Sequence, residues 1–380
     1  MATKIVAAVA RSPQSRFTLE KLVLAAPRSD EVLVRVSASG ICHTDVFTKQ
    51  QGFCPFPMVL GHEGAGIVES VGHSISHIKP GDHVVMTYAS CGSCNACHKA
   101  KPAYCSSHGP LNFGAASPDG TTPFLSSDNT EEKISGNFFQ QSSFATHALT
   151  LSGNVVKVDK DVSSALVAPL GCGVQTGAGA ILNSFNVTPG SSVAVFGCGA
   201  VGLSAIMAAA HIASAARVIA VDVNKERLAL AKKLGATDTV AIDLSATPED
   251  TEAAVLSALM SSSVDGAGLD YALDTSGKSS SMQTAVKALA PMGVVGMVAP
   301  GVPNQKLEFE PMTFLAGKQF RGIIQGDAIP QLFIPQMISH WKANRFPFDQ
   351  IITEYSGLES IDQAIEDMHK GIAIKPVINL

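Results

Sequence analysis

The sequence predicts an α/β protein with a β-rich N-terminal domain and a second domain built on a doubly wound parallel sheet. Three observations support this fold class. The chain has 380 residues, which is longer than one ordinary domain. Residues 1–150 contain short strand-like segments that Pro, Gly and Ser often interrupt. From residue 192 onward strand and helix patterns alternate, as a parallel sheet requires.

In the first domain, alternating apolar residues predict strands over residues 31–36 and 65–71, and a turn followed by a strand over residues 79–86. Strands this short favour a partly open β-barrel. Residues 106–137 are polar and contain many Gly, Ser and Pro, so we expect a long surface loop there.

The second domain begins with a dinucleotide-binding fingerprint. A buried strand pattern over residues 192–196 leads into Gly197, Gly199 and Gly202, and a helix is predicted over residues 203–210. Such glycines let the backbone approach a pyrophosphate at the N-terminus of the helix. A similar fold that binds another ligand is the alternative.

An acidic residue follows at the spacing typical of this fingerprint. Asp222 ends a predicted strand over residues 217–222, where a carboxylate binds the ribose hydroxyls. It also repels a 2′-phosphate, which favours NAD over NADP. The later elements predicted are helices over residues 224–234 and 280–289 and strands over residues 235–240, 268–274 and 293–298.

The composition excludes several classes of protein. Hydrophobic residues make up 46% of the chain and charged residues 16%, which suits large buried cores and not a disordered chain. The net charge is −5, and no basic block is present, so we expect no nucleic-acid partner. Residues 193–216 are apolar and long enough to span a bilayer, but glycines and His211 interrupt them, and a buried strand and helix explain them better. We therefore expect no membrane partner.

Four of the eight cysteines lie close together, at Cys91, Cys94, Cys97 and Cys105. This spacing suits four thiolates around one tetrahedral zinc ion. It differs from the bacterial ferredoxin pattern because seven residues, and not three, separate Cys97 from Cys105. Four unrelated core cysteines are the alternative. A site with four thiolates is closed to further ligands, so its role would be structural.

A second candidate metal site combines Cys42, His62 and Cys172. Each alone fits a buried structural residue. Together, two thiolates and one imidazole form an open zinc site whose fourth position is free for water or an alcohol. Zinc there would lower the pKa of the bound hydroxyl and favour the alkoxide, which can release hydride. Asp45 is the candidate partner that fixes the tautomer of His62.

Taken in order along the chain, these motifs resemble the zinc-dependent medium-chain alcohol dehydrogenases, and the segment 135–146 resembles their aryl or benzyl alcohol dehydrogenase branch. The resemblance implies a GroES-like catalytic domain over residues 1–174, a Rossmann NAD-binding domain over residues 175–322 and a return to the catalytic domain over residues 323–380. It also implies NAD(H) and two Zn²⁺ per chain, the catalytic one on Cys42, His62 and Cys172 and the structural one on Cys91, Cys94, Cys97 and Cys105.

The resemblance also assigns roles to single residues. Thr44 would receive the alcohol proton, and Glu63 would lie near the catalytic metal. The implied cofactor contacts are Thr176 and Val201 at the nicotinamide, His43 and Lys375 at the pyrophosphate, and Asp222 and Arg227 at the adenosine ribose.

One position departs from the family pattern. Many members carry a histidine three residues after the proton-accepting hydroxyl, whereas this chain has Phe47. We expect the proton to leave through water or through His43, with a weaker or differently shaped pH dependence.

The substrate expected is a primary alcohol, aromatic, allylic or otherwise apolar, that is interconverted with its aldehyde. Five aromatic side chains are candidates to line the pocket or to fill the core: Phe53, Phe56, Tyr88, Phe138 and Phe139. A glutathione-dependent formaldehyde dehydrogenase or another alcohol or polyol dehydrogenase is the alternative. Between Asp45 and Glu63 the only Lys or Arg is Lys49, which gives little charge to bind a glutathione adduct.

Two other classes remain as alternatives, a catalytically inactive zinc-bearing scaffold and a nucleic-acid-binding zinc protein. All three catalytic ligands are present, which argues against the scaffold.

We expect a cytoplasmic protein, because no signal peptide pattern is present. The loop over residues 106–137 resembles that of dimeric family members, so we expect a homodimer, with a tetramer as the alternative.

Overall fold

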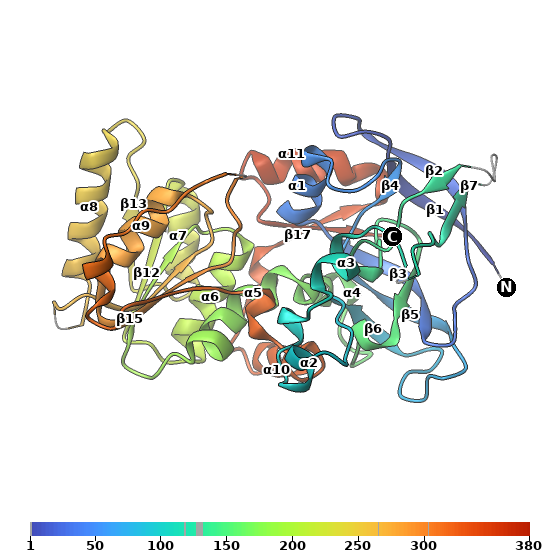
Figure 1. The fold of residues 1–380 in the computed structure, drawn as a ribbon, viewed down its shortest axis with the longest axis horizontal. Coiled ribbons are helices and arrows are strands. Elements are labelled where there is room, and N and C mark those ends of the chain that lie inside the picture. Colours follow the sequence, from blue (N-terminus) through green and yellow to red (C-terminus); the bar gives the residue numbers. More distant parts are fainter. Residues whose placement is uncertain (1, 118, 127–131, 265, 303) are drawn as a thin grey trace. The chain divides into compact units, whose positions relative to one another are not determined.

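The computed structural model describes residues 2–117, 119–126, 132–264, 266–302 and 304–380 (Figure 1). The chain divides into two compact units, and the parallel sheet of one and the β-rich architecture of the other confirm the predicted fold class. The first unit comprises Met1–Cys172, Ile329–Ile338 and Asp349–Leu380, and the second comprises Gly173–Ala328 and Ser339–Phe348.

The unit boundaries differ in detail from the domains expected from the sequence. The chain returns to the first unit at Ile329 and not at residue 323, and Ser339–Phe348 is assigned to the second unit. Helix α10 (Pro330–Lys342) runs across this assignment. A continuous helical pattern carries no local signal for such a boundary, so the sequence could not place it.

The first unit contains two β-sheets. One has the strand order β4-β1-β2-β7-β8, and the other has the order β10-β6-β5-β3-β18-β17 with β9 also paired to β3. The strands of the first sheet are β1 (Thr3–Ala10), β2 (Phe17–Leu24), β4 (Met58–Val59), β7 (Phe124–Ser126) and β8 (Lys133–Ile134). Those of the second are β3 (Glu31–Gly40), β5 (Glu63–Val71), β6 (His83–Met86), β9 (His147–Leu151), β10 (Val155–Val158), β17 (Ile352–Ser356) and β18 (Lys375–Asn379).

The second sheet brings distant parts of the chain together. Strand β3 pairs with β5 on one side, where Gly40 lies opposite Glu63, and with the C-terminal strand β18 on the other, where Gly40 lies opposite Val377. Val34, Val36 and Val68 pack in one buried cluster, whereas Leu33 belongs to another, so this part of β3 is buried on both faces.

The helices of this unit are short. They are α1 (His43–Gln51), α2 (Asn95–His98), α3 (His108–Phe113), α4 (Ser164–Val167) and α11 (Ile361–His369). The prediction of a long surface loop over residues 106–137 was wrong, because α3, β7 and β8 lie within it. Phe113 and Phe124 pack on the core there, and such long-range packing overrides a polar composition. Residues 118 and 127–131 of that segment lie outside the described residues.

The second unit is a six-stranded sheet in the order β13-β12-β11-β14-β15-β16, and every pair in it is parallel. Its strands are β11 (Ser192–Phe196), β12 (Arg217–Asp222), β13 (Asp238–Ala241), β14 (Leu269–Asp274), β15 (Leu289–Met297) and β16 (Gln319–Gly322). Its helices are α5 (Gly173–Gly179), α6 (Ala200–His211), α7 (Lys225–Lys233), α8 (Pro248–Ser261) and α9 (Ser279–Ala288).

Local chemistry explains where these helices begin. The side chain of Asn224 accepts hydrogen bonds from the first-turn amides of α7, and that of Thr247 accepts one from Asp250 N at the start of α8. Helices α8 and α9 cover one face of the sheet, where Leu259 and Val286 pack on strand residues such as Ile219.

The described residues contain no single helix that is long and apolar enough to cross a membrane. The consecutive helical segments Ser164–Gly171 and Gly173–Phe185 together reach the necessary length and composition, and most of their residues are buried inside the protein.

Candidate active site

Four metal-ligating side chains of the first unit converge. Cys42 precedes α1, and His62 directly precedes β5, which begins with Glu63. Cys172 follows the helical turn Ala168–Gly171. One ligand atom from each lies within 4.8 Å of the others. His62 Nε2 is buried and has no hydrogen-bond partner among the described residues. A buried imidazole nitrogen without a partner beside two thiols fits a metal ligand, so these residues suit a zinc ion.

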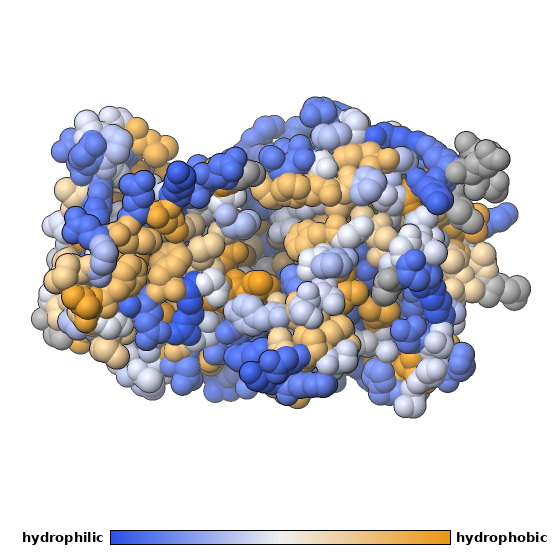
Figure 2. Space-filling view, in the orientation of Figure 1, coloured by the Kyte–Doolittle hydropathy of each residue, from blue (hydrophilic) through white to orange (hydrophobic). Residues whose placement is uncertain are grey.

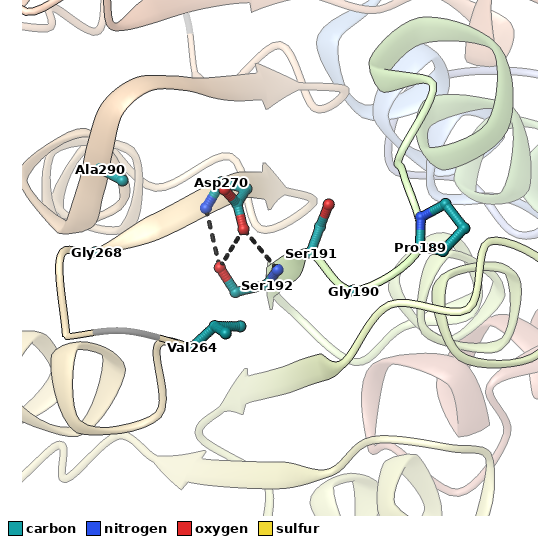
Figure 3. A pocket seen from close by; sticks show the side chains of 8 residues that line it. All are labelled: Pro189, Gly190, Ser191, Ser192, Val264, Gly268, Asp270 and Ala290. Carbon is teal, nitrogen blue, oxygen red and sulfur yellow. Dashed lines mark hydrogen bonds between the residues drawn. The ribbon is translucent and has the colours of Figure 1, made fainter.

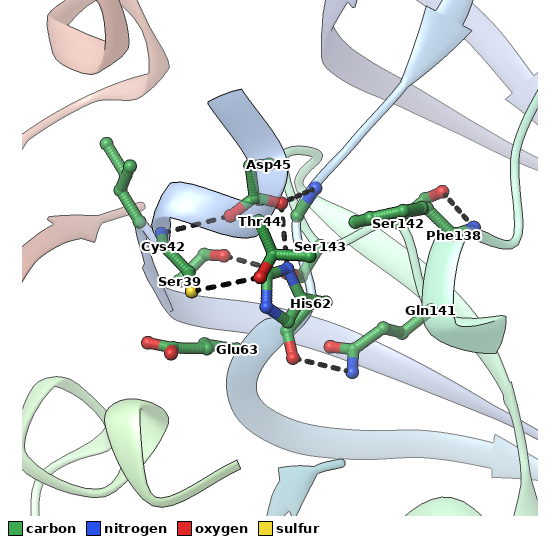
Figure 4. A network of polar contacts seen from close by, with 12 residues as sticks. Ser39, Cys42, Thr44, Asp45, His62, Glu63, Phe138, Gln141, Ser142 and Ser143 are labelled. Carbon is green, nitrogen blue, oxygen red and sulfur yellow. Dashed lines mark hydrogen bonds and ion pairs between the residues drawn. The ribbon is translucent and has the colours of Figure 1, made fainter. Parts of the chain in front are cut away.

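Asp45 orients this group (Figure 4). Its Oδ1 accepts hydrogen bonds from His62 Nδ1 at 2.8 Å and from Gly61 N at 3.1 Å. Its Oδ2 accepts one from Cys42 N at 3.0 Å. Since Nδ1 carries the hydrogen toward the carboxylate, Nε2 keeps its lone pair for a metal. The structure therefore brings Asp45 to the position that the sequence suggested.

The two thiols and the imidazole influence one another's charge. A hydrogen bond from the Cys172 thiol strongly lowers the pKa of Cys42 and raises that of Cys172. Burial lowers the pKa of His62, but the charge and hydrogen bond of Asp45 outweigh burial and raise it to about 10. A metal bound here must therefore displace protons.

Glu63 and Lys375 form a buried ion pair beside the ligands. Lys375 Nζ donates to Glu63 Oε1 and Oε2, both at 2.9 Å, and to Ile41 O at 3.0 Å. Burial raises the pKa of Glu63, and Lys375 counteracts it, while Glu63 outweighs burial and raises the pKa of Lys375. Lys375 is 2% exposed. The three ammonium hydrogens have acceptors inside the first unit, and the pyrophosphate contact expected of Lys375 stays a prediction.

Thr44 and His43 occupy the first turn of α1. Thr44 Oγ1 lies 3.6 Å from Cys42 Sγ, so its hydroxyl borders the ligand group. His43 is exposed, and its ring centroid lies 6.2 Å from that of His369 on α11. The ring of Phe47 packs edge-on against Phe53 at 5.5 Å between centroids, so an aromatic contact occupies the place of the missing histidine.

An aromatic wall lies against the imidazole of His62. Phe139 stacks on it with 4.5 Å between centroids, and Phe138 meets it edge-on at 5.5 Å. Phe113, which the sequence did not single out, contacts both rings edge-on at 5.9 and 5.1 Å. Of the other aromatic candidates, Tyr88 is buried in the core, Phe56 is partly buried and Phe53 is 57% exposed.

The backbone that carries this wall has an unusual conformation. Asn137, Phe139, Gln140 and Ser142 have φ between 48° and 58°, in the left-handed region that non-glycine residues rarely adopt. Gln141 holds the segment in place, since its amide donates to His62 O at 3.0 Å and accepts from Gly64 N at 3.1 Å. No sequence signal pointed to Gln141.

The four-cysteine lobe is also assembled. Ligand atoms of Cys91, Cys94, Cys97 and Cys105 all lie within 4.8 Å of one another, with Cys94 Sγ at 3.6 Å from Cys97 Sγ. Backbone amides point at the sulfurs, as in the 3.2 Å contact from Cys91 N to Cys105 Sγ. The amides of Cys97 and Ser106 lower the pKa of Cys94 to about 5. Burial raises the pKa of Cys97 to about 11 and also raises that of Cys105, so a zinc ion held by the four sulfurs would displace protons from these two thiols.

The second unit carries the glycine fingerprint between β11 and α6. Gly197 has φ +94°, and a Cβ on Gly202 would lie 1.8 Å from Gly197 O, so both positions require glycine. Gly199 caps α6. Thr275 supports the turn, because its hydroxyl donates to Phe196 O at 2.9 Å and to Gly197 O at 3.0 Å.

Asp222 ends β12 beside this turn. Its carboxylate accepts hydrogen bonds from Cys198 N at 2.5 Å and Asn224 N at 2.8 Å. Since a carboxylate offers about four lone-pair sites, it can still accept from a ribose. Arg227 lies in the first turn of α7, and its Nε is buried without a partner among the described residues.

The two remaining cofactor candidates lie on neighbouring helices of the same unit. Thr176 lies on α5 and Val201 on α6. A Cβ on Gly177 would lie 2.0 Å from Val201 O, so the two helices pack closely there.

A second pocket of this unit lies at the amino ends of the parallel strands, away from the glycine fingerprint (Figure 3). Asp270 and Ser192 lie at the start of β14 and β11, and the Asp270 carboxylate accepts from Ser192 N and Oγ, both at 2.8 Å. Ligands of open parallel sheets bind at the carboxyl ends of the strands, so this pocket is not a nucleotide site.

A Rossmann unit, a β-rich unit with a Cys₂His group and a four-cysteine lobe together define a zinc-dependent dehydrogenase. Comparison of the sequence with protein-family models gives the same class of protein. Residues 28–124 match the alcohol dehydrogenase GroES-like domain, and residues 200–340 match the zinc-binding dehydrogenase domain.

Individual proteins give the same result over the whole chain. Geraniol dehydrogenase of Castellaniella defragrans is 41% identical over 98% of this chain and 96% of its own. The probable S-(hydroxymethyl)glutathione dehydrogenase 1 of Schizosaccharomyces pombe is 35% identical over 98% of this chain and 96% of its own. The crystal structure of benzyl alcohol dehydrogenase from Acinetobacter calcoaceticus is 39% identical with a TM-score of 0.91, covering 100% of this chain and 99% of that one. The chain therefore belongs to the zinc-dependent medium-chain alcohol dehydrogenase family, and it is an enzyme of that type.

Proposed function

We propose that this enzyme interconverts a primary allylic or benzylic alcohol and its aldehyde, with hydride transfer to and from NAD(H). The observation that carries the proposal is the convergence of Cys42, His62 and Cys172 next to the aromatic wall of Phe138 and Phe139. The names of the geraniol and benzyl alcohol dehydrogenases support the substrate class.

The ligand group fits the chemistry required. A zinc ion held by Cys42, His62 and Cys172 supplies Lewis-acid chemistry that polarises an alcohol oxygen and lowers the pKa of its proton. Thr44 borders the same group and would receive that proton while passing its own hydroxyl proton on, and NAD, when bound, would supply the hydride acceptor. Asp45 keeps His62 in the ligating tautomer during these steps.

The polar surroundings disfavour a charged glutathione adduct as substrate. Lys49 is the only Lys or Arg between Asp45 and Glu63, and its ammonium already donates to Pro13 O at 3.0 Å and to Ser15 O. The rings of Phe113, Phe138 and Phe139 instead pack on one another, and the last two pack on His62. They make this side of the ligand group apolar, which supports an apolar substrate.

The second unit supports NAD as the cofactor. We propose that Asp222 accepts from the ribose hydroxyls and repels a 2′-phosphate. The open space beside Gly199 at the start of α6 supports a pyrophosphate there. The further cofactor contacts that we propose are Thr176, Val201, Arg227, His43 and Lys375.

We propose two zinc ions per chain, the second held by the four-cysteine lobe in a structural role. All eight cysteines are free of disulfides, which suits a reducing cytoplasm.

We further propose a homodimer. Strand β16 is an edge of the sheet of the second unit, and Met292, Met312 and Leu315 nearby are between 68% and 74% exposed. Figure 2 shows apolar side chains gathered over the part of this unit around β15. Light scattering after size-exclusion chromatography distinguishes dimer from tetramer.

The test of the function is NADH formation with benzylic, allylic and short aliphatic alcohols and with S-(hydroxymethyl)glutathione. We expect the unsaturated alcohols to be preferred; preference for the glutathione adduct would support the alternative. Cys172→Ala is expected to abolish turnover and to leave NAD binding intact. A parallel loss of NAD affinity would contradict this division of roles.

A further inference from the structure

We propose that Lys375 is a positioning residue that retains the catalytic metal, by joining the two chain segments that carry Cys42 and His62. The inference rests on the proposed metal site but not on the identity of the alcohol.

The contacts of Lys375 reach both ligand-bearing segments. Its ammonium donates to Ile41 O, next to Cys42, and to both carboxylate oxygens of Glu63, next to His62. The three acceptors equal the three hydrogens of an ammonium group. Lys375 therefore links Ile41 to Glu63 within the first unit, and we call these three hydrogen bonds the joint.

The sheet explains how Glu63 reaches Lys375. Strand β3 lies between β5, which begins with Glu63, and β18, which begins with Lys375. Strands two places apart in a sheet are about 10 Å apart, so both side chains must extend across β3 to meet.

Gly40 makes this crossing possible. It lies opposite Glu63 in the β3–β5 pair, and a Cβ on it would lie 2.2 Å from Glu63 Oε2. The carboxylate thus occupies the space that a side chain at position 40 would need. Strand pairing also fixes the backbone of β18 here, because Ile41 N donates to Pro376 O at 2.9 Å.

The joint adds a charged contact to two links that already connect the ligand segments. These are the pairing of Gly40 with Glu63 between β3 and β5, and the Asp45 carboxylate, which accepts from Cys42 N and His62 Nδ1. Without the ammonium, Ile41 O and the buried Glu63 carboxylate would lose their shared donor, so the positions of Cys42 and His62 would be less tightly fixed. Groups that support ligands from outside the coordination sphere typically change metal affinity by about 10- to 100-fold.

The experiment measures zinc release to a chromogenic chelator in wild type, Lys375→Met and Lys157→Met. Lys157 is the control for the loss of an ion pair to a buried carboxylate. Its half-exposed ammonium pairs at 2.8 Å with Asp82, which is not one of the proposed ligands. The release phase that is absent from Cys172→Ala identifies the catalytic site. Cobalt substitution adds a visible spectrum that reports the geometry of that site without turnover.

We expect Lys375→Met to accelerate release from the catalytic site about 10- to 100-fold, to alter the cobalt spectrum, and to leave the other release phase unchanged. Lys157→Met should match wild type in every phase. A lower melting temperature with wild-type release and spectrum would overturn the proposal, since a merely structural lysine would give that result. Equal acceleration of zinc release from the catalytic site and from the four-cysteine lobe would also overturn it, because the effect would then not be specific to the catalytic site.

Glu63→Gln tests the joint from the other side if Lys375→Met does not fold, and it should accelerate the same phase. Where all variants fold, the double variant should release zinc no faster than the more affected single variant; additive effects would contradict a shared joint. A wild type with no catalytic-site phase would refute the proposed metal site itself, whereas a normal wild type with an unaffected Lys375→Met would refute only the role of Lys375.

Discussion

Replacing Asp45 by asparagine should weaken the catalytic metal site more than it disturbs the rest of the protein. The carboxylate is 1% exposed and accepts three hydrogen bonds, from His62 Nδ1, Gly61 N and Cys42 N. Asparagine can accept the first two through its oxygen. Its NH₂ group must then face Cys42 N, so two donors meet where a donor and an acceptor had paired.

The magnitude follows from these contacts. A hydrogen bond to a charged group contributes about 1.5–3 kcal/mol to the free energy of folding, and a hydrogen bond between neutral groups contributes about 1 kcal/mol. Asp45→Asn loses the bond from Cys42 N and makes the bonds from His62 and Gly61 neutral, so the free energy of unfolding should fall by about 3 kcal/mol. Zinc affinity at the Cys42 and His62 site should fall about 10- to 100-fold, because the imidazole loses its charged partner.

Competition with a chelator of known zinc affinity measures this effect. Asp82→Asn is the control, because Asp82 is equally buried and accepts from Lys79 N at 3.1 Å, but it does not contact the ligand group. Wild-type zinc affinity in Asp45→Asn would refute the reasoning. A comparable loss in Asp82→Asn would show that general instability, and not the orientation of His62, lowers the affinity.

Three further changes have distinct outcomes. Cys97→Ala should remove one zinc ion per chain and lower the melting temperature, since a structural site contributes folding free energy; unchanged zinc content and melting would contradict a structural zinc there. Asp222→Gly should weaken NAD binding about tenfold and shift the NAD/NADP preference toward NADP, because the charged acceptor of the ribose is lost; an unchanged preference in steady-state kinetics would show that other groups set it. Phe47→His should add a rise in kcat/KM between about pH 6 and pH 8, around the ordinary histidine pKa of about 6.5, because neutral imidazole can accept the departing proton; a pH profile identical to wild type would show that the proton does not leave past this position.

Features set by local spacing were predictable from the sequence. The four-cysteine lobe lies within 15 residues, and the glycine fingerprint joins one strand to the next helix, so short-range geometry already assembles them. The position of Asp45 near His62 also followed, because α1 presents Asp45 one turn after Cys42.

Features set by long-range packing were not predictable in the same way. Lys375 and Glu63 are 312 residues apart, and only the order of strands in the sheet brings them together. The left-handed conformation of Phe139, which turns its ring onto His62, has no signature in a non-glycine residue. Helix α3 inside a polar segment likewise depends on where Phe113 packs.

Zinc content per chain, measured together with NAD reduction by benzylic, allylic and aliphatic alcohols, tests the central claim most directly. The account predicts two zinc ions and reduction of NAD with the benzylic and allylic alcohols. One zinc ion and no reduction with any alcohol would contradict it, and a zinc-bearing scaffold without catalysis would then describe the chain better.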